Sequence, residues 1–216
     1  KNVIITAHTG SGKTLPAEFA IQHFANKGKK VVYTTPIKAL SNEKFNDLQQ
    51  KYPDISFGIL TGDIKFNPEA DVIIMTTEIL YNTLFQKKML REDVLKPEQL
   101  SLHFDMDIEN ELGCVVFDEI HYINDPNRGR IWEETIMMLP KSTQLIGLSA
   151  TIDKPDRFCE WIEKVSMREC WLCSHNKRIV PLTHYSFVTS PDSYYNKFPL
   201  KIKNLIDENQ NKPIIL

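Results

Sequence analysis

The stretch Ala7-His8-Thr9-Gly10-Ser11-Gly12-Lys13-Thr14 decides the fold class of this chain. It follows the apolar run 3–5, which predicts a short buried strand, and precedes apolar residues spaced as on one helix face over 17–25. A strand, a glycine-rich turn and Gly-Lys-Thr at the start of a helix are together typical of a phosphate-binding loop. Gly10 and Gly12 let successive N–H groups face one anion, and the helix N-terminus adds partial positive charge. We expect Lys13 to reach the β- and γ-phosphates of a nucleotide and the Thr14 hydroxyl to hold Mg²⁺.

Two residues depart from the usual form of such a loop. Ala7 stands where the first glycine is usual, and Pro16 lies near the limit at which the first turn of a helix tolerates a missing N–H. A chance glycine turn before a helix is therefore the alternative interpretation of this stretch. The strand before it and the helix after it favour the phosphate-binding loop.

Composition limits the kinds of protein that this chain can be. Its 216 residues are 42% hydrophobic, enough for one large domain, or one domain and part of another, with a full core. A net charge of −2 gives no basic field, but local contacts to a nucleic-acid backbone do not need one. The apolar runs are too short to cross a membrane, and we expect no signal peptide. Because the chain opens on a strand at Lys1, we expect it to be a fragment.

The four cysteines are interpreted as free thiols, because nothing in the chain indicates secretion. Cys170 and Cys173 have the spacing of zinc ligands, with His175 nearby and Cys159 upstream. A second well-spaced ligand pair is missing. The alternative is that these cysteines lie on the apolar side of a strand.

Strands and helices alternate along most of the chain. Further buried strands are predicted at 29–36, 55–60, 72–75, 114–117 and 144–148. Helices are predicted over 17–25, after an N-cap at Ser41, after Thr76 and Thr77, over 132–138 and after 153–156. This order predicts an α/β fold, in which a mostly parallel sheet carries helices on both faces. Residues 86–112 break the rhythm, and we expect them to form a mobile surface insertion.

A pair of acidic residues ends one of the predicted strands. Asp118 and Glu119 follow the strand 114–117, and parallel strands place their carboxyl ends at one edge of the sheet. Asp118 is therefore expected to hold Mg²⁺, and Glu119 to orient the attacking water or accept its proton. An acidic pair at a strand end means little alone. Together with Lys13 and Thr14 it indicates hydrolysis of a nucleoside triphosphate.

Several motifs of the chain resemble those of one helicase family. The stretch 7–14, Asp118-Glu119-Ile120-His121 and Ser149-Ala150-Thr151 look like motifs I, II and III of a superfamily-two DExH-box helicase. The stretches 35–42, 61–63 and 76–80 resemble its motifs Ia, Ib and Ic, and His121-Tyr122, Asp125, Arg128-Gly129 and 132–135 are similar to the superkiller and exosome-associated RNA helicase branch.

The resemblance implies a role for each matching residue. The nucleotide site would comprise Ala7, His8, Thr9, Gly10, Ser11, Gly12, Lys13 and Thr14, with Lys13, Asp118 and Glu119 catalytic and Thr14 and Asp118 holding Mg²⁺. Coupling to the nucleic acid would involve His121, Ser149 and Thr151. The nucleic-acid backbone would be bound by Pro36, Lys38, Gly62, Thr76 and Thr77. For His121, Ser149, Thr151 and these five residues, the alternative is ordinary strand-end, capping, turn or surface chemistry.

The resemblance also implies the organisation and partners of the whole protein. Residues 1–190 would be the first RecA-like domain of a P-loop NTPase, and 191–216 a linker helix and the first strand of a second RecA-like domain. The cofactors would be ATP and Mg²⁺. The partners would be single-stranded RNA, the second RecA-like domain and proteins of an RNA-decay complex, in the cytoplasm or nucleus. A DNA helicase or translocase of the same superfamily and a catalytically silent nucleic-acid-binding scaffold are the alternatives.

Overall fold

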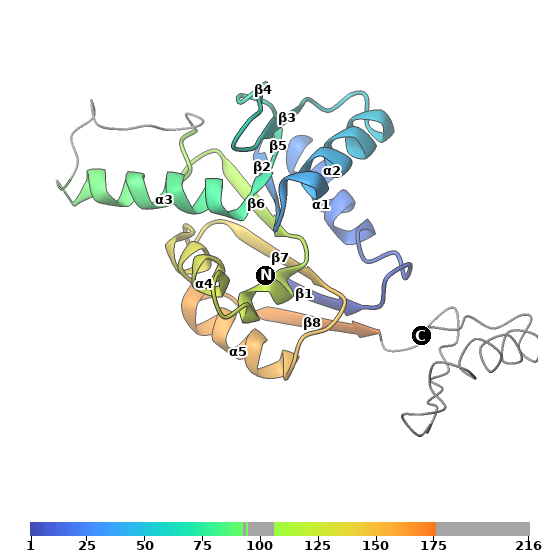
Figure 1. The fold of residues 1–216 in the computed structure, drawn as a ribbon, viewed down its shortest axis with the longest axis vertical. Coiled ribbons are helices and arrows are strands. Elements are labelled where there is room, and N and C mark those ends of the chain that lie inside the picture. The colour runs from blue at the N-terminus through green and yellow to red at the C-terminus, as the bar shows by residue number, and fades with distance from the viewer. Residues whose placement is uncertain (93, 95–105, 176–216) are drawn as a thin grey trace, which may run out of the picture. The chain divides into compact units, whose positions relative to one another are not determined.

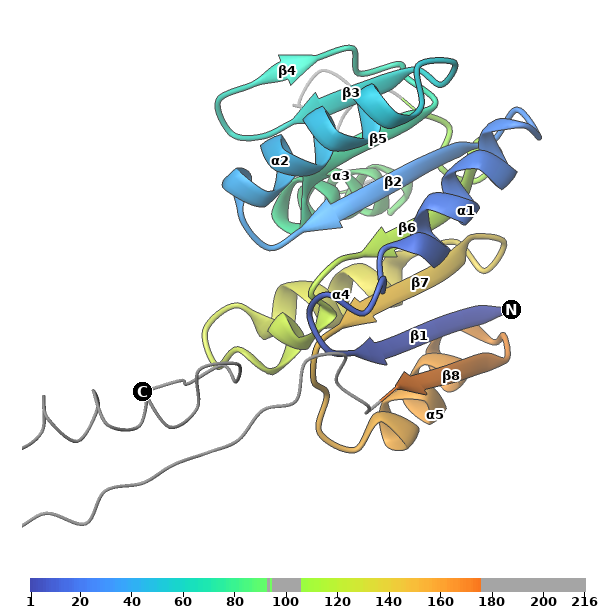
Figure 2. The same cartoon turned by 90° about the vertical axis from the view of Figure 1, so that its right-hand side faces the viewer.

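The computed structural model describes residues 1–92, 94 and 106–175, which contain one eight-stranded sheet covered by helices (Figures 1 and 2). The spatial order of the strands is β4-β3-β5-β2-β6-β7-β1-β8. All neighbouring strands are parallel except β3 and β4, which are antiparallel. The strands are β1 Asn2–Ala7, β2 Lys30–Thr35, β3 Phe57–Leu60, β4 Lys65–Phe66, β5 Val72–Thr76, β6 Leu112–Phe117, β7 Gln144–Ser149 and β8 Cys170–His175.

Helices cover both faces of the sheet, as the alternating pattern predicts (Figure 2). α1 Leu15–Ala25 and α2 Lys38–Lys51 pack on one face. α3 Thr77–Arg91, α4 Gly129–Met138 and α5 Pro155–Ser166 pack on the other, together with the short 3₁₀ helix η2 Ile120–Asn124. The predicted α/β fold with a mostly parallel sheet is therefore confirmed.

The strands read as continuous apolar runs because both faces of the sheet are buried. Successive side chains of a strand point to opposite faces. In β2, Val31 and Tyr33 pack under α1 and α2, whereas Val32 packs on the α3 side. In β5, Ile74 packs on the face covered by α1 and α2, and Met75 packs on the α3 side. The two cores hold the carboxyl ends of β1, β2, β5, β6 and β7 at one edge of the sheet, where the predicted motifs lie.

The structure corrects several boundaries. Ser41 is not an N-cap: α2 already begins at Lys38, and the buried Ser41 hydroxyl lies 2.7 Å from the Thr35 hydroxyl inside the fold. The described ends of the expected insertion 86–112 are ordered parts of the domain. α3 continues to Arg91, and Met106 and Ile108 are buried in the core on the α3 side. Their apolar side chains were too few for the sequence to reveal them as core.

Three further elements differ from the sequence prediction in detail. The strand expected at 55–60 begins at Phe57, and the helix expected at 132–138 begins at Gly129. The edge strand β4 was not predicted, because two exposed residues carry no periodicity. The linker helix and first strand expected within 191–216, and the domain boundary at 190, lie outside the described residues. No helix in the described part is long and apolar enough to cross a bilayer.

The cysteine arrangement does not favour a zinc site. Cys170 is buried in β8, and its thiol contacts that of Cys159 in α5. Cys173 is exposed three residues further along the same strand, and residues at this spacing point to opposite faces. In the described residues no group of three histidine, cysteine or acidic side chains is placed to hold a metal ion.

Candidate functional site

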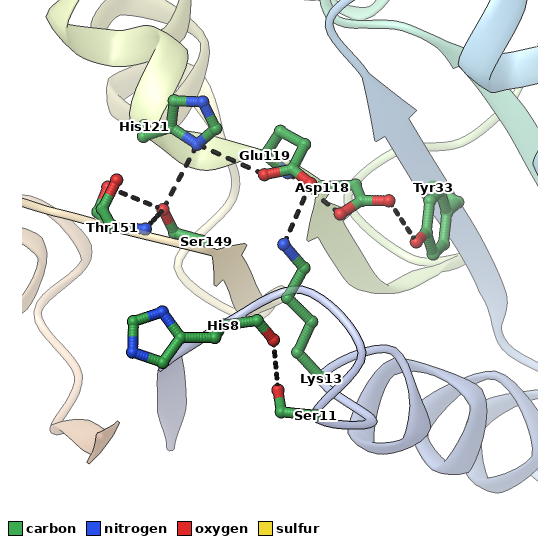
Figure 3. Close-up of polar contacts among 9 residues, drawn as sticks. All are labelled: His8, Ser11, Lys13, Tyr33, Asp118, Glu119, His121, Ser149 and Thr151. Carbon is green, nitrogen blue, oxygen red and sulfur yellow. Dashed lines mark hydrogen bonds and ion pairs between the residues drawn. The ribbon is translucent and has the colours of Figure 1, made fainter. Parts of the chain in front are cut away.

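The loop between β1 and α1 has the backbone shape that its two glycines permit. Gly10 and Gly12 have φ angles of +81° and +80°, in the left-handed region that other residues rarely adopt. The Ser11 N–H and hydroxyl both donate to the His8 carbonyl, at 3.2 and 2.6 Å (Figure 3). α1 then begins at Leu15 with Pro16 in its first turn, where the missing N–H costs no helical bond.

A cavity of about 390 Å³ lies between this loop and the end of β6. Its lining comprises Thr9, Gly10, Gly12, Lys13, Thr14, Leu40, Glu43, Lys44, Asp118 and Glu119. The cavity therefore brings together the loop and the acidic pair, which are more than one hundred residues apart in sequence. A larger hollow of about 670 Å³ beside α1 is lined mainly by apolar groups and contains none of the predicted catalytic residues.

Asp118 is held at the edge of the core by two hydrogen bonds. The buried Tyr33 hydroxyl donates to Asp118 Oδ2 at 2.8 Å, and the Glu119 N–H donates to Oδ1 at 3.0 Å (Figure 3). Burial raises the pKa of Asp118, while the Tyr33 hydrogen bond acts in the opposite direction. Burial and the neighbouring Asp118 charge raise the pKa of Tyr33 well above its usual value, so Tyr33 acts as a donor.

Glu119 adopts an unusual backbone conformation that directs its side chain towards the loop. Its φ and ψ of +49° and +47° lie in the left-handed region, which costs a non-glycine residue about 1–3 kcal/mol. Its Oε1 atom lies 3.0 Å from Lys13 Nζ, in an ion pair whose side chains are only 26% and 11% exposed. Lys13 and Glu119 thus neutralise each other across the cavity.

A second polar chain leads from Glu119 to the end of β7. His121 Nδ1 lies 3.3 Å from Glu119 Oε2, an ion pair only when the imidazole is protonated, and 3.3 Å from the Ser149 hydroxyl. The Ser149 hydroxyl donates to the Thr151 carbonyl and accepts from the Thr151 N–H, at 3.0 and 3.2 Å (Figure 3). The structure therefore brings the three predicted coupling residues together beside the acidic pair.

The residues present fit a nucleotide-bound Mg²⁺. Among the residues that the structure describes, no cationic side chain forms a hydrogen bond with the buried Asp118 carboxylate, and Thr14 lines the same cavity. Mg²⁺ prefers oxygen ligands and is commonly held by one or two protein groups together with phosphates and water. Asp118 and Thr14 are therefore sufficient as the protein's share of such a site.

The residues predicted to bind nucleic acid lie at the same edge of the sheet but differ in exposure. Lys38 is exposed and forms an ion pair of 2.5 Å with Asp63, directly over Gly62. The side chains of Pro36, Thr76 and Thr77 are buried, and that of Thr77 is 0% exposed. At a surface Thr76 and Thr77 can therefore offer only their backbone, at the start of α3, where N–H groups favour phosphate, and Pro36, which has no N–H, can offer only its carbonyl.

Sequence reasoning missed two side chains that support the site. Tyr33 reads as one more apolar residue of a buried strand, and only the register of β2 against β6 shows that it reaches Asp118. Glu78 belongs to a stretch that resembles motif Ic, but the sequence does not reveal its ion pair with Arg128. No signal in a single sequence identifies either contact.

A glycine-turned loop before a helix, a lysine and threonine at its end, and an acidic pair at the end of a parallel strand of the same sheet define a P-loop NTPase. The model of the DEAD/DEAH box helicase family matches residues 1–158. This chain belongs to that family.

Curated relatives agree with this assignment. The chain is 36% identical over 211 residues to the ATP-dependent RNA helicase mtr4 of Schizosaccharomyces pombe. The aligned residues cover 98% of this chain and 16% of that protein. The chain is 41% identical over 181 residues to the antiviral helicase SKI2 of Saccharomyces cerevisiae, covering 84% of this chain and 13% of that protein. The resemblance to the superkiller and exosome-associated branch is thereby confirmed. The chain spans less than a fifth of the length of these two relatives.

Solved structures share the fold. The Mycobacterium smegmatis helicase Lhr, bound to ssDNA and AMP-PNP, superposes with a TM-score of 0.57 at 23% identity, covering 96% of this chain and 29% of that chain. The S. cerevisiae Dbp5 variant in complex with Nup159 and Gle1 gives 0.57 at 19% identity, over 82% and 44%. The RecA-like fold expected from the motifs is confirmed.

Proposed function

We propose that the full-length protein is an ATP-dependent RNA helicase and that this chain supplies its first RecA-like, ATP-binding domain. The convergence of Lys13, Asp118 and Glu119 on one cavity is the observation that carries the proposal. These residue types supply a phosphate ligand, a metal ligand and a general base, which phosphoryl transfer to water requires. An intact set argues against a silent scaffold.

ATP binding is proposed to begin with a change of partner for Lys13. In the structure its ammonium group pairs with Glu119, and a triphosphate entering the loop offers it a stronger set of anionic oxygens. Glu119 is then released to orient a water molecule and to accept its proton. Mg²⁺, held by Thr14 and Asp118, would neutralise the charge on the phosphates.

The nucleotide state is proposed to reach the nucleic acid through the end of β7. His121 Nδ1 lies 3.3 Å from Glu119 Oε2 and 3.3 Å from the Ser149 hydroxyl, so a shift of Glu119 would reach Ser149 and Thr151 through His121. Such a chain would link the two sites by contiguous contacts.

The nucleic-acid strand is proposed to lie across the starts of α2 and α3 and the β3–β4 turn. Backbone N–H groups near Pro36, Thr76 and Thr77, the exposed Lys38 and the turn at Gly62 would contact phosphates. These contacts carry no base specificity and tolerate the chain's slight acidity. The preference for RNA over DNA is supported only by similarity to relatives that are named RNA helicases.

The remaining parts of the proposal concern the whole protein. A second RecA-like domain would close on the nucleotide, and an arginine from such a domain raises rates by ~10³–10⁵ in related reactions. Association with an RNA-decay complex, inside the cell, follows from the similarity to superkiller and exosome-associated helicases. The domain division at residue 190 is part of the same proposal.

The test is ATP hydrolysis by the full-length protein with matched RNA and DNA single strands as stimulants. We expect RNA to stimulate hydrolysis and Glu119→Gln to abolish it. Stimulation by DNA alone would instead identify a DNA translocase. A folded wild-type protein that hydrolyses no ATP would refute the motor function.

A further inference from the structure

The segment between Glu119 and α4 is held by a series of hydrogen bonds. The Tyr122 N–H donates to the Glu119 carbonyl at 3.1 Å, and the Asp125 N–H donates to the Tyr122 carbonyl at 2.9 Å. Asp125 Oδ1 then accepts from the N–H groups of Asn127 and Arg128, at 2.9 and 2.8 Å. Each turn of the segment therefore depends on the one before it.

Packing at Gly129 further restricts this segment. A Cβ atom at Gly129 would lie 2.2 Å from the Ile123 carbonyl oxygen, so the start of α4 rests directly on η2. The Gly129 N–H also donates to the Asp125 carbonyl at 2.8 Å. The position of Arg128 is consequently tied to that of Glu119.

The Arg128 side chain contacts two segments that are far from it in sequence. Its Nη2 donates to the Pro36 carbonyl at 2.7 Å, and its Nε donates to Glu78 Oε1 at 3.1 Å. Nη2 also pairs with Glu78, and the guanidinium lies 5.5 Å from the centre of the Trp132 ring. The side chains of Arg128 and Glu78 are 37% and 30% exposed, so solvent screens the pair only in part.

These two contacts join the segments proposed to bind the nucleic-acid strand. Pro36 directly follows β2 and lies two residues before α2, and Glu78 lies in the first turn of α3. A planar guanidinium is suited to bridging a carbonyl and a carboxylate at once, whereas a lysine ammonium is not. Arg128 thus holds both helix starts in one arrangement.

We propose that Arg128 is a positioning residue that couples the ATP site to RNA binding, by bridging Pro36 and Glu78 from the segment that leaves Glu119. The inference rests on the proposed helicase function. A change at Glu119 on nucleotide binding would move Arg128 through η2, and Arg128 would move the starts of α2 and α3. RNA bound across those starts would act back on Glu119 by the same route.

The test measures ATP hydrolysis by the full-length protein as RNA is titrated. We expect Arg128→Gln and Glu78→Gln each to raise the RNA concentration for half-maximal stimulation about five- to tenfold, the effect of losing a charge-assisted hydrogen bond that is partly screened. Hydrolysis without RNA and binding of a non-hydrolysable ATP analogue should stay within about twofold of wild type. The double variant should need no more RNA for half-maximal stimulation than the more strongly affected single variant, because both substitutions remove the same bridge.

Arg130→Gln is the matched control. Arg130 lies two residues further along, makes a 2.5 Å ion pair with Glu134 within α4, and is largely exposed. It loses the same charge without touching Pro36 or Glu78, so its RNA titration should match the wild type.

Several outcomes would overturn the inference. The first is an RNA titration of Arg128→Gln that equals that of Arg130→Gln. The second is an effect of Arg128→Gln without an effect of Glu78→Gln, which would indicate that Arg128 contacts a phosphate directly. The third is additive losses in the double variant. If Arg128→Gln does not fold, Arg128→Lys decides: an unchanged RNA titration contradicts the bridge. A wild-type protein without RNA stimulation would refute the proposed function itself, a result distinct from all of these.

Discussion

Glu119→Gln is expected to tighten nucleotide binding while it removes hydrolysis. Glu119 Oε1 lies 3.0 Å from Lys13 Nζ. The attraction between unit charges at that distance is about 5.5 kcal/mol at an effective dielectric constant of about 20. The cost of desolvating the two charges cancels most of this attraction, and glutamine retains a hydrogen-bond acceptor for Lys13. Freeing Lys13 should therefore cost about 1 kcal/mol more in the wild type than in Glu119→Gln. The released Lys13 should therefore bind phosphates about fivefold more tightly.

Isothermal titration calorimetry with Mg²⁺ and a non-hydrolysable ATP analogue measures the binding, and phosphate release measures hydrolysis. Hydrolysis should fall by ~10²–10⁴, the usual contribution of a general base. Glu134→Gln is the control, because Glu134 also pairs with a cation at 2.5 Å but lies in α4 away from the cavity. Binding by Glu119→Gln that is unchanged or weaker would show that the Lys13 pair does not compete with the nucleotide.

Three further predictions follow from named contacts. Tyr33→Phe deletes the 2.8 Å hydrogen bond to Asp118 and should raise the Mg²⁺ concentration for half-maximal hydrolysis about tenfold, by titration of the cation. Gly129→Ala forces a Cβ to within 2.2 Å of the Ile123 carbonyl and should cost about 2 kcal/mol, a fall of roughly 4–8 °C in the Tm of the domain. Backbone N–H donors hold the pKa of Asp125 below its usual 3.8, so its charge stabilises the fold at neutral pH. The Tm difference between wild type and Asp125→Asn should therefore shrink as the pH falls below about 4, through that lowered pKa.

Two of these predictions have a control variant, and the third has a refuting outcome. Tyr81→Phe removes an equal 2.8 Å bond to Glu134 outside the cavity, and a similar Mg²⁺ effect there would refute the role of Tyr33. In Gly28→Ala the added Cβ meets open space at a φ of +64°, so this variant measures backbone strain alone. A fall in Tm for Gly129→Ala no larger than that for Gly28→Ala would argue against the steric explanation. A Tm difference for Asp125→Asn that is constant with pH would show that its charge contributes nothing.

The sequence by itself determined the class of fold and most of the nucleotide site. Runs such as 72–75 are apolar at every position because helices cover both sheet faces, and that signal is local. Gly10, Gly12 and Lys13 are readable for the same reason, since the loop's chemistry depends on neighbours in sequence. Asp118 could be added because a parallel sheet brings strand ends to one edge.

The contacts that adjust the site were decided only by the tertiary structure. Tyr33 reaches Asp118 because β2 and β6 pair in one register, and Arg128 reaches Glu78 because α4 packs beside α3. Thr77, expected at a surface, is buried because the first turn of α3 faces the core. Such contacts join residues about 50 to 90 positions apart, and no periodicity or spacing within one sequence encodes which pair will meet.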